Sequence, residues 1–236
     1  MKTIRRAGSS APLAAMLLLA LSVSGGESQI LAGDPVWNRA VEMAGRGRLT
    51  PQAAIVMTTG SGVGGESEIE TWVTFRTDQD GELHSKIIHR REGAKVLDRE
   101  GRERRNEIDT RRRRAAPFRI DDIPIHPQLQ PLVSYRRIGE SGGVVRFEFT
   151  MRRDEHEILG TVAVSRSANS VTIDFEPRPL PFGVRSFHST LRMASGPVDG
   201  YRLESMTVTG DVGALWMRRS FRSEYRFLEE LPAGRR

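Results

Sequence analysis

The feature that most constrains this chain is a two-residue alternation of apolar and polar side chains that recurs from residue 68 to residue 227. It is clearest in the segments EIETWVTFRT (68–77), VVRFEFTM (144–151), TVAVS (161–165), VTIDFE (171–176), FHSTLRM (187–193) and MRRSFRSEYRF (217–227). Successive side chains of a β-strand point to opposite faces, so each segment is expected to be a half-buried strand. Turn residues such as Gly93, Ser167–Asn169 and Gly200 separate the segments. The pattern predicts a mainly β fold, an antiparallel meander that curls over itself.

The shared periodicity also predicts which side chains meet in the interior. The residues expected to face one common apolar concavity are Val73, Phe75, Phe147, Phe149, Phe175 and Phe221. An α-helix is expected over DPVWNRAVEMAGRG, with Asp34 as N-cap, Pro35 in the first turn and an end at Gly45 or Gly47. The segment KVLDREGRERR (95–105) is expected to belong to the strand region.

The amino terminus has the pattern of a secretory signal peptide. Lys2, Arg5 and Arg6 precede an apolar stretch from Ala11 to Val23, which is followed by small residues. The chain contains no cysteine, so a lipid-modified cysteine anchor is not expected. We therefore predict a signal peptide at residues 1–26, one domain at residues 27–236, and a periplasmic or secreted protein without a lipid anchor.

Positive charge is concentrated in one place. Residues 99–119 contain nine arginines and four acids, among them the consecutive Arg111, Arg112, Arg113 and Arg114. Because the excess charge is one local patch and an exported protein seldom meets nucleic acid, nucleic-acid binding is not expected. We predict that the four arginines form an exposed loop that guides the protein to an anionic membrane surface or an acidic envelope protein. The alternative is a solvated connection without a binding role.

The chain lacks the motifs of catalytic, metal and nucleotide sites. GSGVGG (60–65) matches a dinucleotide fingerprint in letters, but a strand pattern follows it where a helix is required. The five histidines have no zinc-ligand spacing, and no nucleophile motif accompanies the acids near His126 and His156. The expectation is a protein that is not an enzyme and that has no metal and no cofactor.

The order of elements and the wording of the last third resemble the outer-membrane lipoprotein-sorting proteins, the LolA/LolB-like fold. The resemblance covers about residues 35 to 228 and is carried mainly by GTVAVS, VTIDFEPRPLP and GDVGALWMRRSFRSEYRF, in that order. It implies an unclosed β-barrel of about eleven antiparallel strands with capping helices and an apolar concavity that holds acyl chains. The missing anchor cysteine departs from the LolB-like receptors, and no arginine matches the functional arginine of the sorting proteins.

Three classes of function follow from this resemblance and from the residues. The first is a periplasmic carrier that binds a lipid or lipoprotein acyl chain in the concavity. The second is an envelope interaction or signalling module that uses the same fold, and the third is a hydrolase. Burying sixteen methylenes is worth at most about 13 kcal/mol, against about 1 kcal/mol for each arginine beside an anionic membrane. The concavity is therefore the expected source of affinity, and the arginines are expected to steer docking.

Overall fold

The computed structural model describes residues 33–62, 65–77, 83–113, 123–153, 156–180, 182–196, 200–213 and 218–230. Within these ranges, the side chains of Leu83, residues 107–113 and Arg153 are not described. All of these ranges belong to one compact unit, Ala32–Arg236. The predicted signal peptide at residues 1–26 lies outside the described residues.

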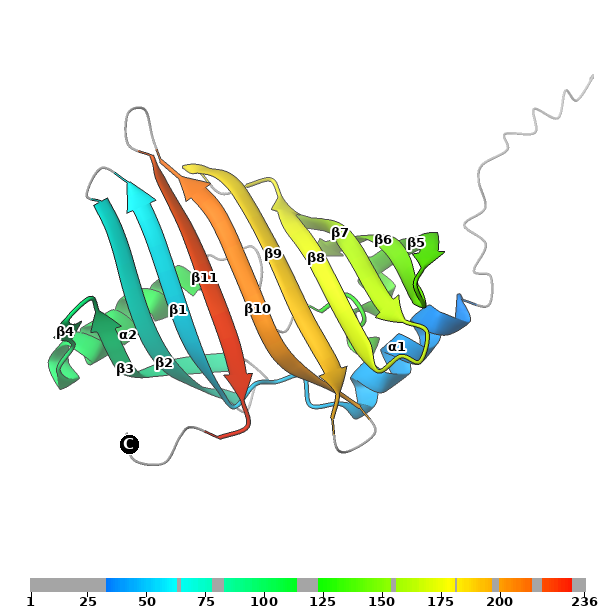
Figure 1. The fold of residues 1–236 in the computed structure, drawn as a ribbon, viewed down its shortest axis with the longest axis horizontal. Helices are drawn as coiled ribbons and strands as arrows, with labels where there is room; N and C mark the ends of the chain where they lie inside the picture. The colour runs from blue at the N-terminus through cyan, green and yellow to red at the C-terminus, as the bar shows by residue number, and fades with distance from the viewer. Residues whose placement is uncertain are drawn as a thin grey trace, which may run out of the picture. The chain divides into compact units, whose positions relative to one another are not determined.

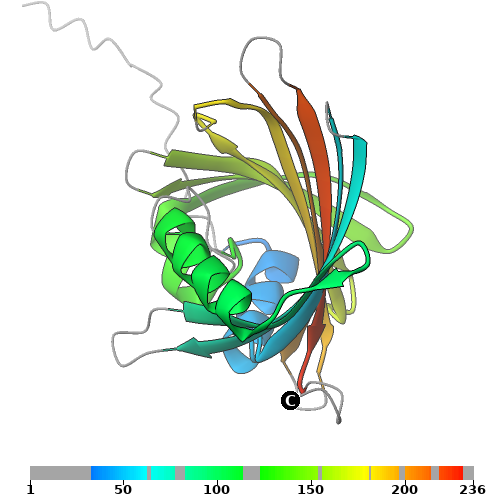
Figure 2. The same cartoon turned by 90° about the vertical axis from the view of Figure 1, so that its left-hand side faces the viewer.

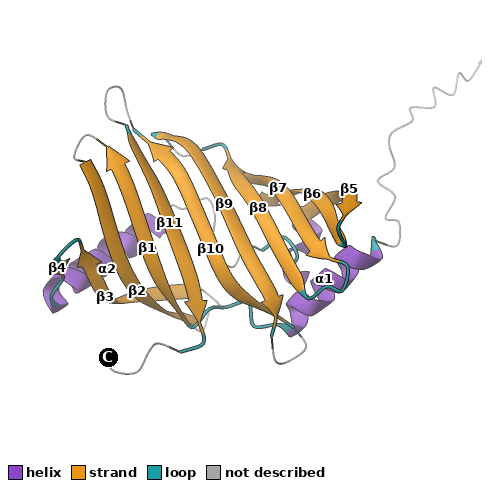
Figure 3. Ribbon diagram, viewed as in Figure 1, coloured by secondary structure: helices purple, strands orange, loops and turns teal. Residues whose placement is uncertain are grey.

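The described residues form one open antiparallel sheet of eleven strands with few helices, as Figures 1 and 3 show. The mainly β prediction and the expected number of strands are therefore confirmed. The strand order is β4-β3-β2-β1-β11-β10-β9-β8-β7-β6-β5. The strands are β1 (Ala53–Gly62), β2 (Gly65–Thr77), β3 (Leu83–Glu92), β4 (Lys95–Val96), β5 (Val133–Ser141), β6 (Val144–Arg153), β7 (His156–Ser165), β8 (Ser170–Arg178), β9 (Val184–Ser195), β10 (Tyr201–Val212) and β11 (Arg219–Leu228).

The sheet is unclosed because its two edge strands do not pair with each other, although they are consecutive strands in the chain. The first long strand, β1, pairs with the last strand, β11, in the middle of the sheet. The edges are β4 and β5, and the chain between them contains the helix α2 (Arg99–Arg113) and the short 3-10 helix η1 (Pro127–Leu132). Figure 2 shows α2 and the first helix, α1 (Pro35–Arg46), together on the concave side of the sheet. We call the sheet surface on this side the inner face.

Helix α1 begins and ends where the sequence predicts. Asp34 is the N-cap, and its Oδ1 accepts hydrogen bonds from the backbone N–H groups of Val36 (2.9 Å) and Trp37 (3.4 Å). Pro35 occupies the first turn, where its missing N–H costs no helical hydrogen bond. The helix ends before Gly47, whose N–H donates to the carbonyl oxygen of Met43. The buried side of the helix consists of Trp37, Ala40, Met43 and Ala44.

The hydrophobic core lies between α1 and the inner face of β6, β7 and β8. The Trp37 ring stacks on Tyr135 with centroids 4.0 Å apart and meets Phe147 edge-on at 5.3 Å. Gly160 of β7 lies opposite Phe149, and an added Cβ atom there would be 2.9 Å from the Phe149 ring. The glycine therefore makes room for the aromatic ring. The alternating strands supply the rest of the core, which includes Val145, Met151, Ile158, Val162, Val164, Val171, Ile173, Leu191 and Met193.

The expected strand over residues 95–105 is wrong beyond its first two residues. Only Lys95–Val96 pair as a strand, and α2 starts at Arg99. The segment lacks alternating apolar residues and instead has helix-forming Arg and Glu, with an ion pair four residues apart between Arg99 and Glu103 (2.9 Å). Asp98 supports the helix start, since its Oδ1 accepts from the Gly101 N–H at 2.8 Å. The helix propensity of its residues therefore determines the secondary structure of this segment.

Helix α2 covers part of an exposed strand edge. Beyond its short pairing with β4, strand β3 has a free edge, and Asn106 of α2 binds it. The Asn106 Oδ1 accepts from the Ile87 N–H at 2.8 Å, and its Nδ2 donates to the Ile87 carbonyl oxygen at 3.5 Å. The amide side chain thereby takes the place of a neighbouring strand, which satisfies an edge that could otherwise pair with another chain.

The predicted arginine loop needs a correction. Arg111, Arg112 and Arg113 belong to the last turn of α2 and are therefore helical rather than in a loop. The side chains of these three residues, and the whole of Arg114, lie outside the described residues. Their role in guiding the protein to an anionic surface stays a prediction.

Candidate functional site

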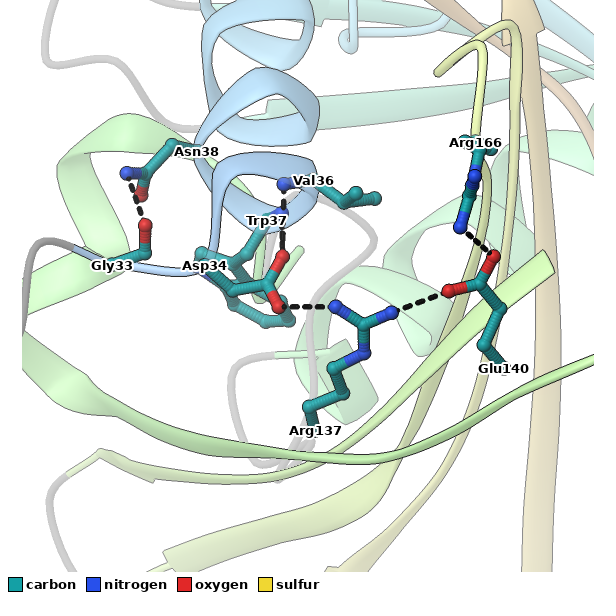
Figure 4. Close-up of polar contacts among 8 residues, drawn as sticks. All are labelled: Gly33, Asp34, Val36, Trp37, Asn38, Arg137, Glu140 and Arg166. Carbon is teal, nitrogen blue, oxygen red and sulfur yellow. Dashed lines mark hydrogen bonds and ion pairs between the residues drawn. The ribbon is translucent and has the colours of Figure 1, made fainter. Parts of the chain in front are cut away.

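A chain of ion pairs holds the start of α1 over the β5 edge of the sheet (Figure 4). The Oδ2 atom of Asp34 pairs with Nη1 of Arg137 at 3.1 Å, and Nη2 of Arg137 pairs with Oε2 of Glu140 at 2.5 Å. Glu140 also pairs with Arg166. The same Asp34 carboxylate caps α1 through its other oxygen, so the network links the helix cap to β5. Its geometry is that of a structural anchor.

This anchoring places α1 over one part of the inner face, and α1 does not cover the remaining part. Helix α1 contacts η1, β7 and the β10 strand that begins at Tyr201. Farther along the inner face, three inward aromatic side chains are packed against the core but only partly buried. They are Phe187 on β9, and Phe221 and Tyr225 on β11. We call these three residues the aromatic strip, and it is the candidate binding site.

The strip alternates with small residues in the register of the sheet. Phe187 lies opposite Gly210, Gly210 lies opposite Phe221, and Phe221 lies opposite Gly60. The Phe221 ring leans over Gly210, since an added Cβ atom there would be 2.9 Å from it. The next row contains Ser223 and Thr58, whose hydroxyl oxygens are 2.9 Å apart. The strip is therefore an apolar surface with a few hydroxyl groups at its centre.

A buried hydroxyl also lies on this part of the inner face. Ser189 is 1% exposed and faces inward between Phe175 and Val208 in the register. Its Oγ has no hydrogen-bond partner in the described part of the chain. An unpaired buried hydroxyl is unfavourable, and at 1% exposure Ser189 is not accessible to a ligand in this conformation.

A cavity of about 790 Å³ opens near the carboxyl end of α1. It is lined by the end of α1, the segment from Gly47 to Gln52, the end of β2 and His126. Arg48 and Arg76 make its wall partly polar, while Phe75 contributes an aromatic ring. Of the six residues that the sequence predicts for an apolar concavity, only Phe75 lines this cavity.

All six of those residues face the same interior. Val73, Phe147, Phe149 and Phe175 belong to the buried core, and Phe75 and Phe221 pack against it with part of their surface exposed. The first four have between 0% and 6% of their surface exposed, so in this conformation they support the fold and cannot touch a ligand. Ligand contact stays a prediction for all six, and the geometry favours it at Phe221 and Phe75. That set omits three inward residues, which are Phe187, Tyr225 and Arg219. The alternation of apolar and polar residues in β9 and β11 is the sequence pattern that indicates their inward orientation.

The contacts of His188 do not match a nucleophile-activating arrangement. On the outer face, Asp174 accepts from the Thr190 hydroxyl at 2.6 Å and lies 3.6 Å from Nε2 of His188. The carboxylate lies between the other two groups, whereas nucleophile activation requires the histidine to contact the hydroxyl. Across the described ranges, no three His, Cys, Asp or Glu side chains gather as metal ligands would.

The shifted pKa values belong to structural groups. Burial raises the pKa of Tyr201 to about 12. The hydrogen bond from the Trp72 indole, with Arg91 as a second partner, lowers the pKa of the Glu70 carboxyl. Glu70 and Trp72 alternate with the inward Ile69, Thr71 and Val73, so they lie on the outer face. In the described part of the chain, no helix is long and apolar enough to cross a membrane.

The comparisons with known proteins leave the family open. No protein-family model matches the sequence, and no curated protein matches it. Among solved structures, the chain matches the MucA/MucB complex of Pseudomonas aeruginosa with 12% identity. That match covers 81% of this chain and 93% of the other chain, with a TM-score of 0.19. A TM-score this low supports no conclusion about fold family or function.

Proposed function

We propose that the protein binds a hydrophobic ligand, such as a lipid or the acyl chain of a lipoprotein, on the aromatic strip and carries it in the periplasm. The proposal includes a LolA-like fold, export by the signal peptide at residues 1–26, and no catalytic role. The observation that carries it is the strip itself: Phe187, Phe221 and Tyr225 face inward and yet remain partly exposed. Inward aromatic side chains without full cover are a usual component of an apolar binding site.

The magnitude of the apolar contact is sufficient for binding. Full burial of sixteen methylenes is worth about 13 kcal/mol at about 0.8 kcal/mol each. A chain that lies on one face of a sheet keeps part of its surface in water, so about half of this value, roughly 6 kcal/mol, is a reasonable figure. Association and ordering reduce it further. The expected affinity is that of a carrier that releases its ligand.

The test uses a neutral apolar probe, N-phenyl-1-naphthylamine, and its displacement by 1-hexadecanol. The purified protein should bind the probe with enhanced fluorescence, and hexadecanol should displace it. Phe221→Ser should weaken binding about tenfold, because losing one aromatic contact costs about 1.4 kcal/mol. The matched control is Phe182→Ser, which removes a fully exposed phenylalanine from the turn between β8 and β9.

The outcomes separate the possible functions. Unchanged binding by Phe182→Ser together with weaker binding by Phe221→Ser supports the aromatic strip as the site. If the wild-type protein binds neither the probe nor hexadecanol, the carrier proposal is wrong and the envelope interaction module replaces it. Native mass spectrometry of protein purified from the periplasm should independently show a co-purified lipid.

A further inference from the structure

Arg219 lies on the inner face at one end of the aromatic strip. It precedes Phe221 by two residues on β11, so the two side chains share a face of the sheet. The Arg219 side chain crosses β1 over two glycines: an added Cβ atom would be 3.3 Å from its Cγ at Gly62 and 3.5 Å from its Nε at Gly60. Its Nη2 then donates to Oγ of Ser67 on β2 at 3.1 Å. The two glycines therefore provide the space in which this arginine lies across the sheet.

The Arg219 guanidinium has no carboxylate within ion-pair distance among the described residues. Two other arginines at inward register positions do have such partners: Arg90 pairs with Glu92 at 2.8 Å, and Arg137 pairs with Asp34. A guanidinium has five N–H donors, and the contact with Ser67 accounts for one of them. Arg219 is therefore a cation with free donors next to an apolar surface.

We propose that the ligand of the aromatic strip is an anionic amphiphile whose acidic group binds Arg219. This inference rests on the proposed function and adds to it the chemical class of the ligand. The acidic group is a carboxylate or a phosphate, since both form short charge-assisted hydrogen bonds with a guanidinium. The apolar chain then lies along Phe221 and Tyr225.

The spacing along β11 suits a long acyl chain. The Arg219 guanidinium lies in the row of Phe221, because its partner Ser67 is opposite Gly60 and Gly60 is opposite Phe221, so the first methylenes after the acidic group would lie beside the Phe221 ring. Tyr225 is four residues beyond Phe221 on β11, or about 13 Å along the strand. Phe187, the third residue of the strip, lies on the far side of Gly210 from Phe221. An extended chain attached to an acidic group at Arg219 would thus contact apolar side chains along its length.

The guanidinium also has a defined orientation. Ser67 Oγ, which accepts from Arg219, itself donates to the carbonyl oxygen of Gly60 at 3.4 Å. A serine hydroxyl has one proton to donate, so this bond leaves its lone pairs to accept from the arginine. The arginine is therefore held across β1 before a ligand binds, and less side-chain entropy is lost on binding.

The test compares ligands that share an apolar chain and differ in the acidic group. Palmitate, 1-palmitoyl-lysophosphatidylglycerol and 1-hexadecanol are each titrated at pH 8 against the protein with bound N-phenyl-1-naphthylamine, and the displacement of the probe is measured. We expect Arg219→Gln to weaken the binding of palmitate or of the lysophospholipid about tenfold and that of hexadecanol less than twofold. The ligand that loses affinity identifies the acidic group as carboxylate or phosphate.

The matched control is Arg222→Gln, which removes the same charge from the same strand. Arg222 alternates with the inward residues, is exposed, and pairs with Glu224 at 2.7 Å. Its loss should leave the binding of all three ligands unchanged, whereas Arg219→Lys should restore part of the anion affinity.

The failure of this inference is distinguishable from the failure of the proposed function. If the wild-type protein binds none of the three ligands, the aromatic strip is not an acyl-chain site and both proposals are wrong. If hexadecanol binds and Arg219→Gln leaves both anionic ligands unaffected, the anionic ligand class is wrong while the carrier function stands. Equal losses for all three ligands, or equal effects of the two Arg→Gln changes, would also overturn the assignment of Arg219.

Discussion

Replacing Tyr201 with phenylalanine tests how a buried hydroxyl affects this fold. Tyr201 is the first residue of β10, is 1% exposed, and its hydroxyl has no hydrogen-bond partner in the described structure. Arg39 of α1 is the charged group that acts on it. Tyr201→Phe removes the hydroxyl and keeps the ring, so the apolar contacts of the core are preserved.

The expected effect at neutral pH is small and favourable. A buried hydroxyl without a partner costs about 1–3 kcal/mol, and its removal restores this amount only in part, because the unfolded tyrosine is hydrated. We therefore expect Tyr201→Phe to leave the free energy of unfolding unchanged at pH 7 or to raise it by up to about 1 kcal/mol.

The expected effect at alkaline pH is larger. The pKa of Tyr201 is raised from 10.0 to about 12 by burial. The unfolded chain therefore loses the phenolic proton first, and the stability linked to neutral Tyr201 is complete below pH 10 and is lost as the pH rises towards 12. Two pH units correspond to about 2.7 kcal/mol. The wild-type protein should lose up to this amount across the window, and Tyr201→Phe should not.

The assay is urea denaturation followed by fluorescence or circular dichroism at pH 7, 9, 10 and 11. Tyr135→Phe is the matched control, because the Tyr135 hydroxyl has a backbone partner at Asp34 and its removal should cost about 1 kcal/mol at pH 7. The reasoning is refuted if Tyr201→Phe destabilises the protein by more than about 1 kcal/mol at pH 7, or if the wild-type and variant proteins lose stability equally between pH 9 and pH 11.

Two further predictions concern the sheet. Gly160→Ala should lower the free energy of unfolding by about 1–3 kcal/mol, since its Cβ would collide with the Asp174 carbonyl oxygen and press on the Phe149 ring. The control is Gly139→Ala, whose added Cβ meets no atom within 4 Å. Equal thermal midpoints for the two variants would contradict this explanation. Asn106→Ala should cost about 1–2 kcal/mol and speed hydrogen exchange at the Ile87 amide, because that amide loses its partner. Unchanged exchange at Ile87 would show that α2 does not protect the β3 edge.

Much of the fold could be predicted because its signals are local. The N-cap and Pro35 define the start of α1, and the two-residue alternation assigns Phe147, Phe149 and Phe175 to the inner face. The strand expected over residues 95–105 is limited to Lys95–Val96, because the segment has no alternation and its charged residues favour a helix. In that segment the distinction depends on helix propensity and capping at Asp98.

The candidate site could be predicted only in part. The alternation of β11 places Arg219 on the same face as Phe221, yet an arginine at the end of a charged strand is usually solvated. Its position over Gly60 and Gly62 depends on the pairing of β1 with β11, strands about 160 residues apart in the chain. Likewise, the link between Asp34 and Arg137 depends on where α1 docks on β5.

The sequence by itself determined the strand-rich composition, the limits of α1 and the face of each strand that turns inward, because these depend on side-chain periodicity and on caps within a few residues. Only the tertiary structure decided that β1 pairs with β11, that β4 and β5 remain unpaired edges, and that α1 leaves Phe187, Phe221 and Tyr225 partly exposed. Periodicity specifies a face but not a neighbour, and the choice of neighbour depends on packing between residues that are distant in the chain.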